Sequence, residues 1–378
     1  MSTTGSLTAR MPYFTGPSAR IGTAVAAVVA LVLPFMINDV FWLAILTTAG
    51  VYTLGAVSLN AVAGYLGEAS LGQAFFLSVG CYAGVAAGMK GQLPLLGWVA
   101  VVLVVGALAG LVVAPLAMRL SGPHLIIITL GLVFLGQYVF SNWRGLTGGP
   151  GGTAFALPMS IGDLDFGALQ FGGYLYSREQ GLSLLTWIFV AIAMWWVHNI
   201  ATSRRGRETR AVRDNPLAAQ VAGVSVWRCK AGAFAVSGAL AALAGALFAQ
   251  QISYVEPEIF NFHLSIQFVA ILVIGGSATA FGPAIGGVFV ALIPALLTRY
   301  LTDAPFVLAP NDKGFGMTVS QLSSFTYAVL LVLFLLFEPR GINALITRAV
   351  GVCSRIATGH RSPSVPAVPA SAHKENHA

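Results

Sequence analysis

Long runs of apolar residues, separated by short polar segments, make up most of this chain. A helix needs about 20 apolar residues to cross a hydrocarbon core about 30 Å thick, and about ten runs approach this length. The pattern therefore predicts an all-α, polytopic membrane protein with about ten transmembrane helices. The predicted spans are residues 20–37, 40–63, 70–89, 94–118, 123–142, 182–201, 231–252, 264–281, 283–301 and 320–338.

The eighth and ninth runs are almost continuous. Only the stretch GGSATAFGP, from Gly275 to Pro283, interrupts them. Gly-Gly followed by Gly-Pro is typical of a turn or a helix break. Two short spans are expected here, and one span followed by a re-entrant segment is the alternative.

The composition supports the membrane prediction. Hydrophobic residues make up 57% of the chain and charged residues 9%, whereas about a quarter of the residues in a soluble domain are charged. The 43 glycines fit helices that approach one another closely in a membrane. Cys81, Cys229 and Cys353 are far apart and lack metal-ligand spacing, so neither a disulfide framework nor a metal site is predicted.

The basic residues predict the orientation. Cytoplasmic loops of membrane proteins collect Lys and Arg. If residues 204–230 are cytoplasmic and the spans alternate, 15 of the 20 basic residues lie inside, and eight of the 13 acidic residues lie outside. Both termini are then cytoplasmic. This asymmetry explains the net charge of +7 without a nucleic-acid partner.

The predicted organisation has three parts. Residues 1–19 form a cytoplasmic leader, residues 20–342 the membrane domain, and residues 343–378 a cytoplasmic tail that is largely disordered because its end is rich in Pro, Ser and Ala. The first apolar run is expected to stay as an anchor. The only long outer loop, residues 143–181, is Gly-rich and contains several aromatic residues. It is interpreted either as a loop capped by interfacial aromatic side chains or as a docking surface for something outside the membrane.

The basic stretch RRGRETRAVRDNPLAAQVAGVS, residues 204–225, predicts two helices. Spacings of four residues between Arg204 and Glu208 and between Arg210 and Asp214 favour a helix with surface ion pairs that continues the sixth span. A second helix of about two turns is expected from Pro216, with Asn215 as its N-cap and Gly223 as its stop.

The second of these helices is too short to be stable alone. Leu217 and Val221, with Ala218 beside them, would form one small apolar face that needs a partner surface. Docking onto another protein is the favoured interpretation. Binding of the arginines to anionic lipid headgroups is the alternative.

Charges inside the apolar runs are rare, which argues against an ion-coupled carrier, because such carriers place ionisable residues at membrane depth. Glu68 is the main exception. It is either the N-terminal charge of a helix that starts at Ser70, where the helix dipole favours a carboxylate, or it borders a solute pathway together with Ser70 and Gln73.

Recognisable catalytic motifs are missing from the sequence. No GxxxxGK[ST] phosphate loop, HExxH motif or catalytic triad spacing occurs, so a transporter is favoured over an enzyme. If ATP drives the protein, another chain must hold the nucleotide.

Several segments together resemble a known family. They are Gly64–Gly84, Arg119–Leu132, Leu146–Gly149, the stretch of about 40 residues from Gly206, Gly275–Gly287 and Phe337–Ile342. Their order and sequences resemble the branched-chain amino acid ABC transporter permeases of the LivM type. Pro216 stands where such permeases more often have a polar residue, and His124 stands where they more often have an aromatic one.

The resemblance implies a multi-pass subunit of an importer in the bacterial inner membrane. It implies a second permease of the LivH type, two ATPase subunits that use ATP and Mg, and an extracytoplasmic solute-binding protein, with no cofactor bound by this chain. The implied solutes are leucine, isoleucine and valine. Urea or short amides are the alternative, because urea permeases share most of these motifs, and an ion-coupled secondary transporter is a more distant one.

The resemblance also implies site residues. The ATPases would dock on the cytoplasmic loop at Gly206, Arg207, Arg210, Ala211, Arg213, Asn215, Ala218, Ala219 and Gly223, with Lys230 as the cation that opens the next span. The candidates for the translocation pathway are Glu68, Ser70, Gln73 and Thr129, and those for docking of the binding protein are Thr147, Gly148 and Gly149.

Overall fold

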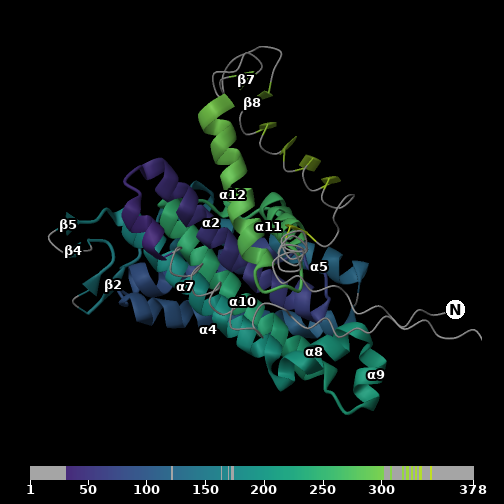
Figure 1. The fold of residues 1–378 in the computed structure, drawn as a ribbon. Coiled ribbons are helices and arrows are strands. Elements are labelled where there is room, and N and C mark those ends of the chain that lie inside the picture. The colour runs from purple at the N-terminus through teal and green to yellow at the C-terminus, as the bar shows by residue number, and fades with distance from the viewer. Residues whose placement is uncertain are drawn as a thin grey trace, which may run out of the picture. The chain divides into compact units, whose positions relative to one another are not determined.

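The computed structural model describes residues 31–120, 122–162, 164–168, 170–171 and 174–301. It also describes short stretches at 307–308, 317–318, 321–322, 325–326, 328–329, 332–333 and 341–342. These residues form a bundle of helices (Figure 1). The leader, most of the first and tenth predicted spans, and the C-terminal tail lie outside the described residues.

Six helices of the described residues are long and apolar enough to cross a membrane. These helices overlap the second predicted span and the fourth to eighth predicted spans, one helix to each span. Apolar helices are therefore confirmed for these six spans. They are α2 Val40–Leu59 with its continuation as the π-helix η1 Asn60–Leu66, α4 Leu95–Arg119, α5 Pro123–Asn142, α7 Arg178–Thr202, α10 Val226–Ile252, and α11 Phe262–Gly275 with the 3-10 turn η4 Pro257–Ile259 before it.

Two further helices occupy the third and ninth predicted spans. The first is α3, Gln73–Gly84, which continues as the π-helix η2 Val85–Lys90, and the second is α12, Gly282–Leu301. Neither is among the six long apolar helices of the described part of the chain. The predicted number of about ten spans is therefore not established by the described residues.

The run from 264 to 301 folds as two antiparallel helices. Gly275 faces Gly282 and Ile271 faces Gly286 so closely that a Cβ on any of these three glycines would overlap the opposite backbone. After the turn α12 runs back along α2, and Arg299 near its end forms an ion pair of 3.3 Å with Asp39, the N-cap of α2. This arrangement favours the two-span prediction over the re-entrant one.

Contacts between distant segments agree with the predicted alternation of sides. Segments predicted to share the outer side touch one another, and so do segments predicted to share the inner side. The outer contacts are Lys90 to Gly145, Gln180 to Ile37 and Arg299 to Asp39, and the inner contacts are Glu68 to Lys230 and Arg213 to Gly64.

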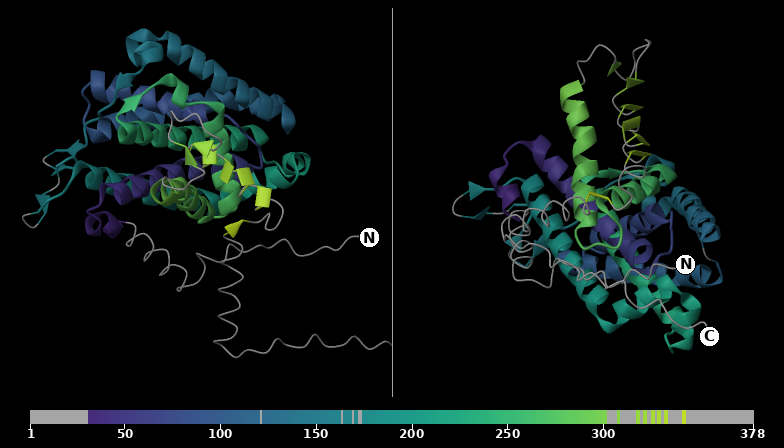
Figure 2. Two further views of the ribbon diagram at one scale, coloured as in Figure 1. Left: turned by 90° about the horizontal axis from the view of Figure 1, so that it is seen from above. Right: turned by 45° about the vertical axis from the view of Figure 1, so that its right-hand side comes forward.

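The loop predicted at 143–181 contains secondary structure that an all-α prediction leaves out. After the helical turns α6 Arg144–Thr147 and η3 Gly149–Gly151, the strand β1 Thr153–Ala154 pairs with β6 Tyr254–Val255. Two hairpins follow, β2 Ser160–Ile161 with β3 Leu164–Asp165 and β4 Gln170–Phe171 with β5 Tyr174–Leu175. A further pair, β7 Val307–Leu308 and β8 Met317–Thr318, is parallel. The hairpins and the basic stretch lie at opposite ends of α7 and α10, as two loops on opposite sides of a membrane require (Figure 2).

Small residues let α10 occupy the centre of the bundle. Its segment AVSGALAALAGAL packs against α4, α3 and α2. Gly238 lies against the carbonyl of Gly106 on α4, and Gly245 lies against the backbone of Leu77 on α3. Membrane helices associate through such close packing, because lipid is as apolar as the side chains and supplies no hydrophobic driving force between helices.

We predict that Gly238→Val destabilises the protein by about 1–3 kcal/mol, the usual cost of overpacking, because a side chain here would overlap the Gly106 carbonyl. Thermal unfolding of the purified protein in detergent measures the effect. Gly131→Val is the matched control, since nothing lies within 4 Å of a Cβ at Gly131. Equal melting temperatures for the two variants would contradict the packing argument.

Candidate functional site

The end of the basic stretch forms the predicted second helix, α9, Pro216–Val221. The Asn215 side chain caps it, with its Oδ1 accepting hydrogen bonds from the backbone amides of Leu217 at 3.1 Å and Ala218 at 3.0 Å. Pro216 occupies the first helical position, and Gly223 takes a left-handed φ of +81° just after the helix. The sequence signals for this helix are confirmed.

The first helix of the stretch, α8 Arg204–Asp214, does not continue α7, so this part of the prediction is wrong. Ser203 is extended and ends α7, and its hydroxyl accepts a hydrogen bond from the amide of Gly206 at 3.4 Å. Arg207 donates to the carbonyl of Thr202 at 3.1 Å, which satisfies an end group of α7. Two local polar interactions thus make a corner where helical periodicity alone predicted a straight helix.

One of the two predicted ion pairs on α8 is present. Arg204 contacts Glu208 at 3.1 Å, whereas the ion pairs of the described residues do not include Arg210 with Asp214. Arg210 is half-buried, Ala211 is exposed and Gly206 is buried against the end of α7. Asp214 is the last residue of α8, where the chain turns into the Asn215 cap.

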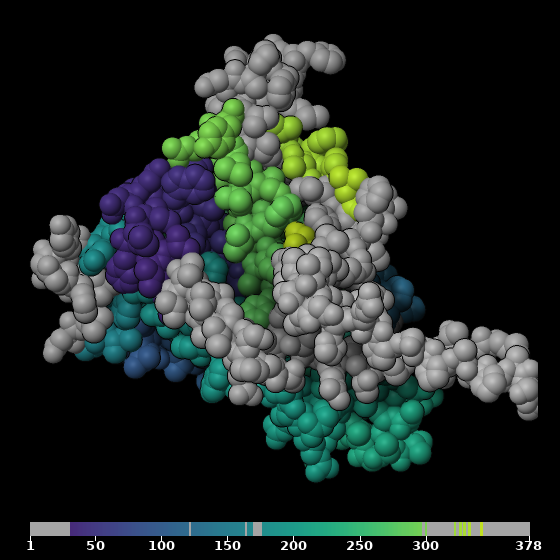
Figure 3. Space-filling view, viewed as in Figure 1, coloured from purple at the N-terminus to yellow at the C-terminus, as the bar shows by residue number. Residues whose placement is uncertain are grey.

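The apolar face of α9 is uncovered. Leu217 is 73% exposed and Val221 is 92% exposed, whereas Ala219 on the opposite side is buried. Ala218 beside them is also exposed. Figure 3 shows the α8–α9 segment, in teal green, projecting at the lower edge of the molecule. Two large apolar side chains on a projecting helix are suited to a partner surface.

Arg213, at the other end of α8 from Ser203, turns toward the membrane helices. Its guanidinium donates to the carbonyl of Gly64 in η1 at 2.5 Å, and its aliphatic part lies against Gly67. A side chain on Gly67 would approach the Arg213 Cγ to 2.6 Å. In the structure the side chain of Arg213 fastens α8 to η1. Docking of an ATPase at Arg213 and at the other residues implied for it stays a prediction.

The same π-helix holds the turn between α11 and α12. Asn60 donates from Nδ2 to the carbonyl of Thr279 at 3.0 Å, and its Oδ1 accepts from the amide of Ala278 at 2.8 Å. Asn60 is not among the residues that the sequence patterns single out. The available signal was a buried-type amide side chain inside an otherwise apolar run, where a polar group needs a partner.

Glu68 forms a buried ion pair with Lys230. The side chain of Lys230 is 9% exposed and that of Glu68 is 13% exposed, and their charged atoms are 2.5 Å apart. Lys230 also donates to the carbonyl of Ala117 on α4 at 2.7 Å. The pair therefore joins the segment after η1 to α10 and α4.

One prediction about these charges is wrong. α3 begins at Gln73 with Gly72 as its N-cap, so Glu68 is not the first-turn carboxylate of a helix that starts at Ser70. α10 begins at Val226, so Lys230 lies in its second turn, directly before the apolar run from residue 231. Glu68 and Lys230 compensate each other's buried charge. Local sequence patterns do not reveal this pair, because the two residues are far apart in the chain.

The remaining pathway candidates surround the N-terminus of α3. Gln73 donates to the carbonyl of Gly55 at 2.9 Å and to the Ser58 hydroxyl at 2.6 Å. Thr129 accepts from the amide of Leu71 at 3.0 Å, and the Ser70 hydroxyl accepts from the amide of Gly72 at 3.3 Å. All three candidates are buried. A role in solute passage stays a prediction for these residues and for Glu68.

The segment LTGG shapes the start of the outer loop. The Thr147 hydroxyl donates to the carbonyl of Phe140 at 2.7 Å and accepts from the amide of Gly149 at 3.0 Å. Gly148 and Gly149 both take left-handed φ values, +78° and +76°. Thr147 and Gly149 are buried, and Gly148 is exposed. Docking of a binding protein at these residues stays a prediction, in which Gly148 is the one that a partner could touch.

Comparison with known proteins identifies the family. Residues 41–337 match the family described as the branched-chain amino acid transport system, permease component. The chain is 27% identical over 354 residues to the high-affinity branched-chain amino acid transport system permease protein LivM of Salmonella typhimurium, which covers 89% of this chain and 77% of that protein. For the LivM protein of Escherichia coli K12 the identity is 26% over 334 residues, covering 83% and 72%.

A second group of relatives belongs to a different import system. The autoinducer 2 import system permease protein LsrC of Klebsiella pneumoniae is 32% identical over 206 residues, which covers 53% of this chain and 55% of that protein. No solved structure matches the chain. The chain belongs to the branched-chain amino acid permease family, and it is a transmembrane subunit of an ABC transporter in the bacterial inner membrane.

We predict that Lys230→Met costs about 3–5 kcal/mol of stability, because it leaves the Glu68 carboxylate buried without its partner. Adding Glu68→Gln should recover part of this loss, which a double-mutant cycle of unfolding free energies measures. Arg204→Ala is the control, because its ion pair with Glu208 is exposed on the arginine side and such pairs contribute less than about 1 kcal/mol. Similar losses for Lys230→Met and Arg204→Ala would exclude a structural role for the buried pair.

Proposed function

We propose that this chain is the membrane-spanning subunit of an importer for leucine, isoleucine and valine, driven by ATP hydrolysis in partner subunits. The observation that carries the proposal is the capped helix α9, which presents Leu217 and Val221 without cover and which α8 fastens to the membrane helices through Arg213. An ATPase that binds this segment could transmit its movement to the bundle.

The other partners follow from the same assignment. Two ATPase subunits, which hold ATP and Mg, would serve this chain and a second permease of the LivH type. A solute-binding protein would deliver solute to the side that carries the hairpins. This chain itself would bind neither nucleotide nor metal.

The contacts around η1 supply a mechanism for the coupling. Movement of α8 would pull on the Gly64 carbonyl through Arg213, and η1 would carry the displacement through Asn60 to the turn between α11 and α12. Single-turn π-helical segments are frequent at functional sites. Coupling over this distance needs a continuous chain of contacts that has two arrangements, and these contacts are the proposed chain.

The amino acid assignment has support from the extent of the matches. The LivM relatives cover 89% and 83% of this chain, whereas the LsrC relative covers 53%. The LsrC relative also indicates that related permeases serve chemically different solutes. Urea and short amides remain the alternative solutes, since urea permeases share most of the sequence motifs.

We predict that proteoliposomes containing all subunits of the importer take up radiolabelled leucine only with internal ATP and Mg and with the binding protein outside. Excess isoleucine or valine should compete, and urea should not. Uptake of urea, or of the LsrC-type solute, in place of leucine would refute the solute while leaving the importer assignment. Uptake driven by an ion gradient without the ATPases would refute the importer assignment itself.

We predict different defects for the two ends of the α8–α9 segment. Leu217→Asp with Val221→Asp should weaken ATPase binding about 30-fold, because loss of an interface hot spot costs about 2 kcal/mol or more. Arg213→Glu, with or without Arg210→Glu, should leave the ATPases bound and hydrolysing ATP while uptake falls about tenfold or more. Co-purification, ATP hydrolysis and uptake are measured on the same preparations.

Conservative variants control this comparison. Leu217→Met with Val221→Ile keeps the apolar face of α9, and Arg213→Lys keeps a donor for the Gly64 carbonyl, so both should behave nearly like the original protein. If uptake by Arg213→Glu continues at the full rate and still requires the ATPases, Arg213 does not couple the two processes.

A further inference from the structure

A cavity of about 500 Å³ lies between the end of α7, the start of α10 and the corner formed by α8. This volume is typical of binding sites for small molecules, which measure about 300–1,000 Å³. Its walls are mostly apolar, with Val197 and Ile200 contributed by α7 and Val236 by α10. One lining residue, Gly206, also belongs to the set implied in ATPase docking, whereas Arg205 and Arg228 do not.

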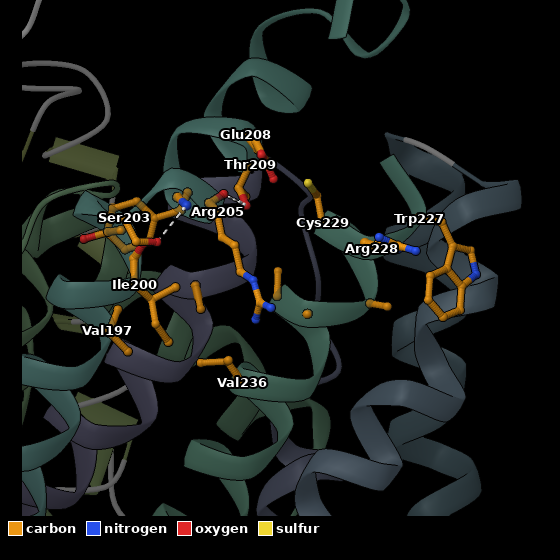
Figure 4. Close-up of a pocket in the computed structure, with 17 residues that line it drawn as sticks. Val197, Ile200, Ser203, Arg205, Glu208, Thr209, Trp227, Arg228, Cys229 and Val236 are labelled. Carbon is orange, nitrogen blue, oxygen red and sulfur yellow. Dashed lines mark hydrogen bonds between the residues drawn. The ribbon is translucent and has the colours of Figure 1, made fainter. Parts of the chain in front are cut away.

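Two arginines line this apolar cavity. Arg205 on α8 and Arg228 on α10 both belong to its lining. Figure 4 shows the Arg205 side chain leaving α8 and running into the cavity toward Val236, with Val197 and Ile200 on one side and Trp227 and Arg228 on the other. Both arginines are exposed, so a ligand that enters from solvent or from the membrane surface can reach their guanidinium groups.

Neither arginine is neutralised within the part of the chain that the structure describes. The ion pairs there are Arg204 with Glu208, Lys230 with Glu68 and Arg299 with Asp39. Glu208 also lines the cavity, but its carboxylate is held by Arg204 at 3.1 Å. The hydroxyls of Ser203 and Thr209 donate to the carbonyls of Ile200 and Arg205. The cavity therefore offers two cationic groups above an apolar wall.

The position of the cavity, at the ends of two membrane helices, indicates what kind of ligand it binds. Val197 and Ile200 lie in the last turns of a membrane helix, and Trp227 and Arg228 lie in the first turn of another. Trp and Arg at such positions are typical of the boundary between lipid and water. By the distribution of basic residues, this boundary is the cytoplasmic one, where the anionic lipids attract basic groups.

We propose that this cavity binds the phosphate of an anionic phospholipid between Arg205 and Arg228, with the acyl chains against Val197, Ile200 and Val236. The ligand must be anionic to match the two guanidinium groups and apolar to cover the wall below them, and a lipid of the inner leaflet has both properties. A bound lipid would hold α8 against α7 and α10 at the corner made by Ser203. The site does not depend on which solute is carried.

Native mass spectrometry of the purified full chain tests the proposal, with phosphatidylglycerol, phosphatidylcholine and inorganic phosphate as probes. The original protein should retain phosphatidylglycerol in preference to phosphatidylcholine. Each arginine near an anionic headgroup contributes about fivefold to affinity, so Arg205→Gln with Arg228→Gln should weaken binding about 30-fold. Equal retention of phosphatidylglycerol by this double variant would overturn the proposal, and so would equal retention of the two lipids by the original protein.

Two further variants separate the cavity from general attraction to positive charge. Arg119→Gln removes an exposed arginine at the same end of the bundle but outside the cavity, so it should keep the lipid. Val236→Trp keeps both arginines but fills the apolar wall, so it should lose the lipid while remaining monodisperse. Loss with Arg119→Gln equal to that of the double variant, or full retention with Val236→Trp, would refute a defined site.

The source of the anion is tested in the same way. If inorganic phosphate protects the protein against thermal unfolding as well as phosphatidylglycerol does, the site binds free phosphate and the lipid proposal is wrong. A photoreactive residue in place of Ile200, activated in membranes that contain the complete importer, should form an adduct with lipid. An adduct with a partner subunit instead would show that a protein covers this cavity.

Discussion

Where a helix ends or is interrupted inside the packed bundle, its free backbone amides and carbonyls are shielded from water, so other groups of the protein must form hydrogen bonds with them. Most of the buried polar side chains described above serve this purpose. Thr129 and Ser265 accept from the amides of Leu71 and Ala74 at the start of α3. Lys230 donates a hydrogen bond to the carbonyl of Ala117 near the end of α4. Each interruption of a helix thereby creates a specific contact with a different helix.

This constraint explains why the structural contacts and the proposed coupling contacts are the same ones. Arg213 donates a hydrogen bond to the carbonyl of Gly64, and Asn60 accepts one from the amide of Ala278. Both acceptor and donor belong to places where regular α-helix is lost, namely η1 and the turn before α12. A regular helix resists local displacement, whereas an interrupted one can change its hydrogen bonds at lower cost. Moving α8 would therefore act first on the least regular part of the bundle.

The sequence determines some of these features locally and others only through the fold. The extents of α4 and α5 follow from the lengths of their apolar runs, and α9 follows from Asn215, Pro216 and Gly223, which are neighbours in the chain. The corner at Ser203 was missed because two local hydrogen bonds, one to the Ser203 hydroxyl and one from Arg207, override the helical periodicity on both sides of it. The partnership of Glu68 with Lys230 was missed because 162 positions separate them in the sequence and only the packing of α10 against α4 and η1 brings them together.

The arginines of α8 have different roles that a count of charges does not distinguish. Counting basic residues predicts on which side of the membrane the segment lies, but it treats every arginine alike. In the structure Arg204 pairs with Glu208, Arg207 holds the end of α7, Arg213 holds η1, and Arg205 points into the cavity. Three of these four side chains thus have partners within the chain, and the uncovered α9 beside them is apolar. Recognition of an ATPase here would rest on Leu217 and Val221 more than on positive charge, which leaves Arg205, together with Arg228, available for an anion at the membrane surface.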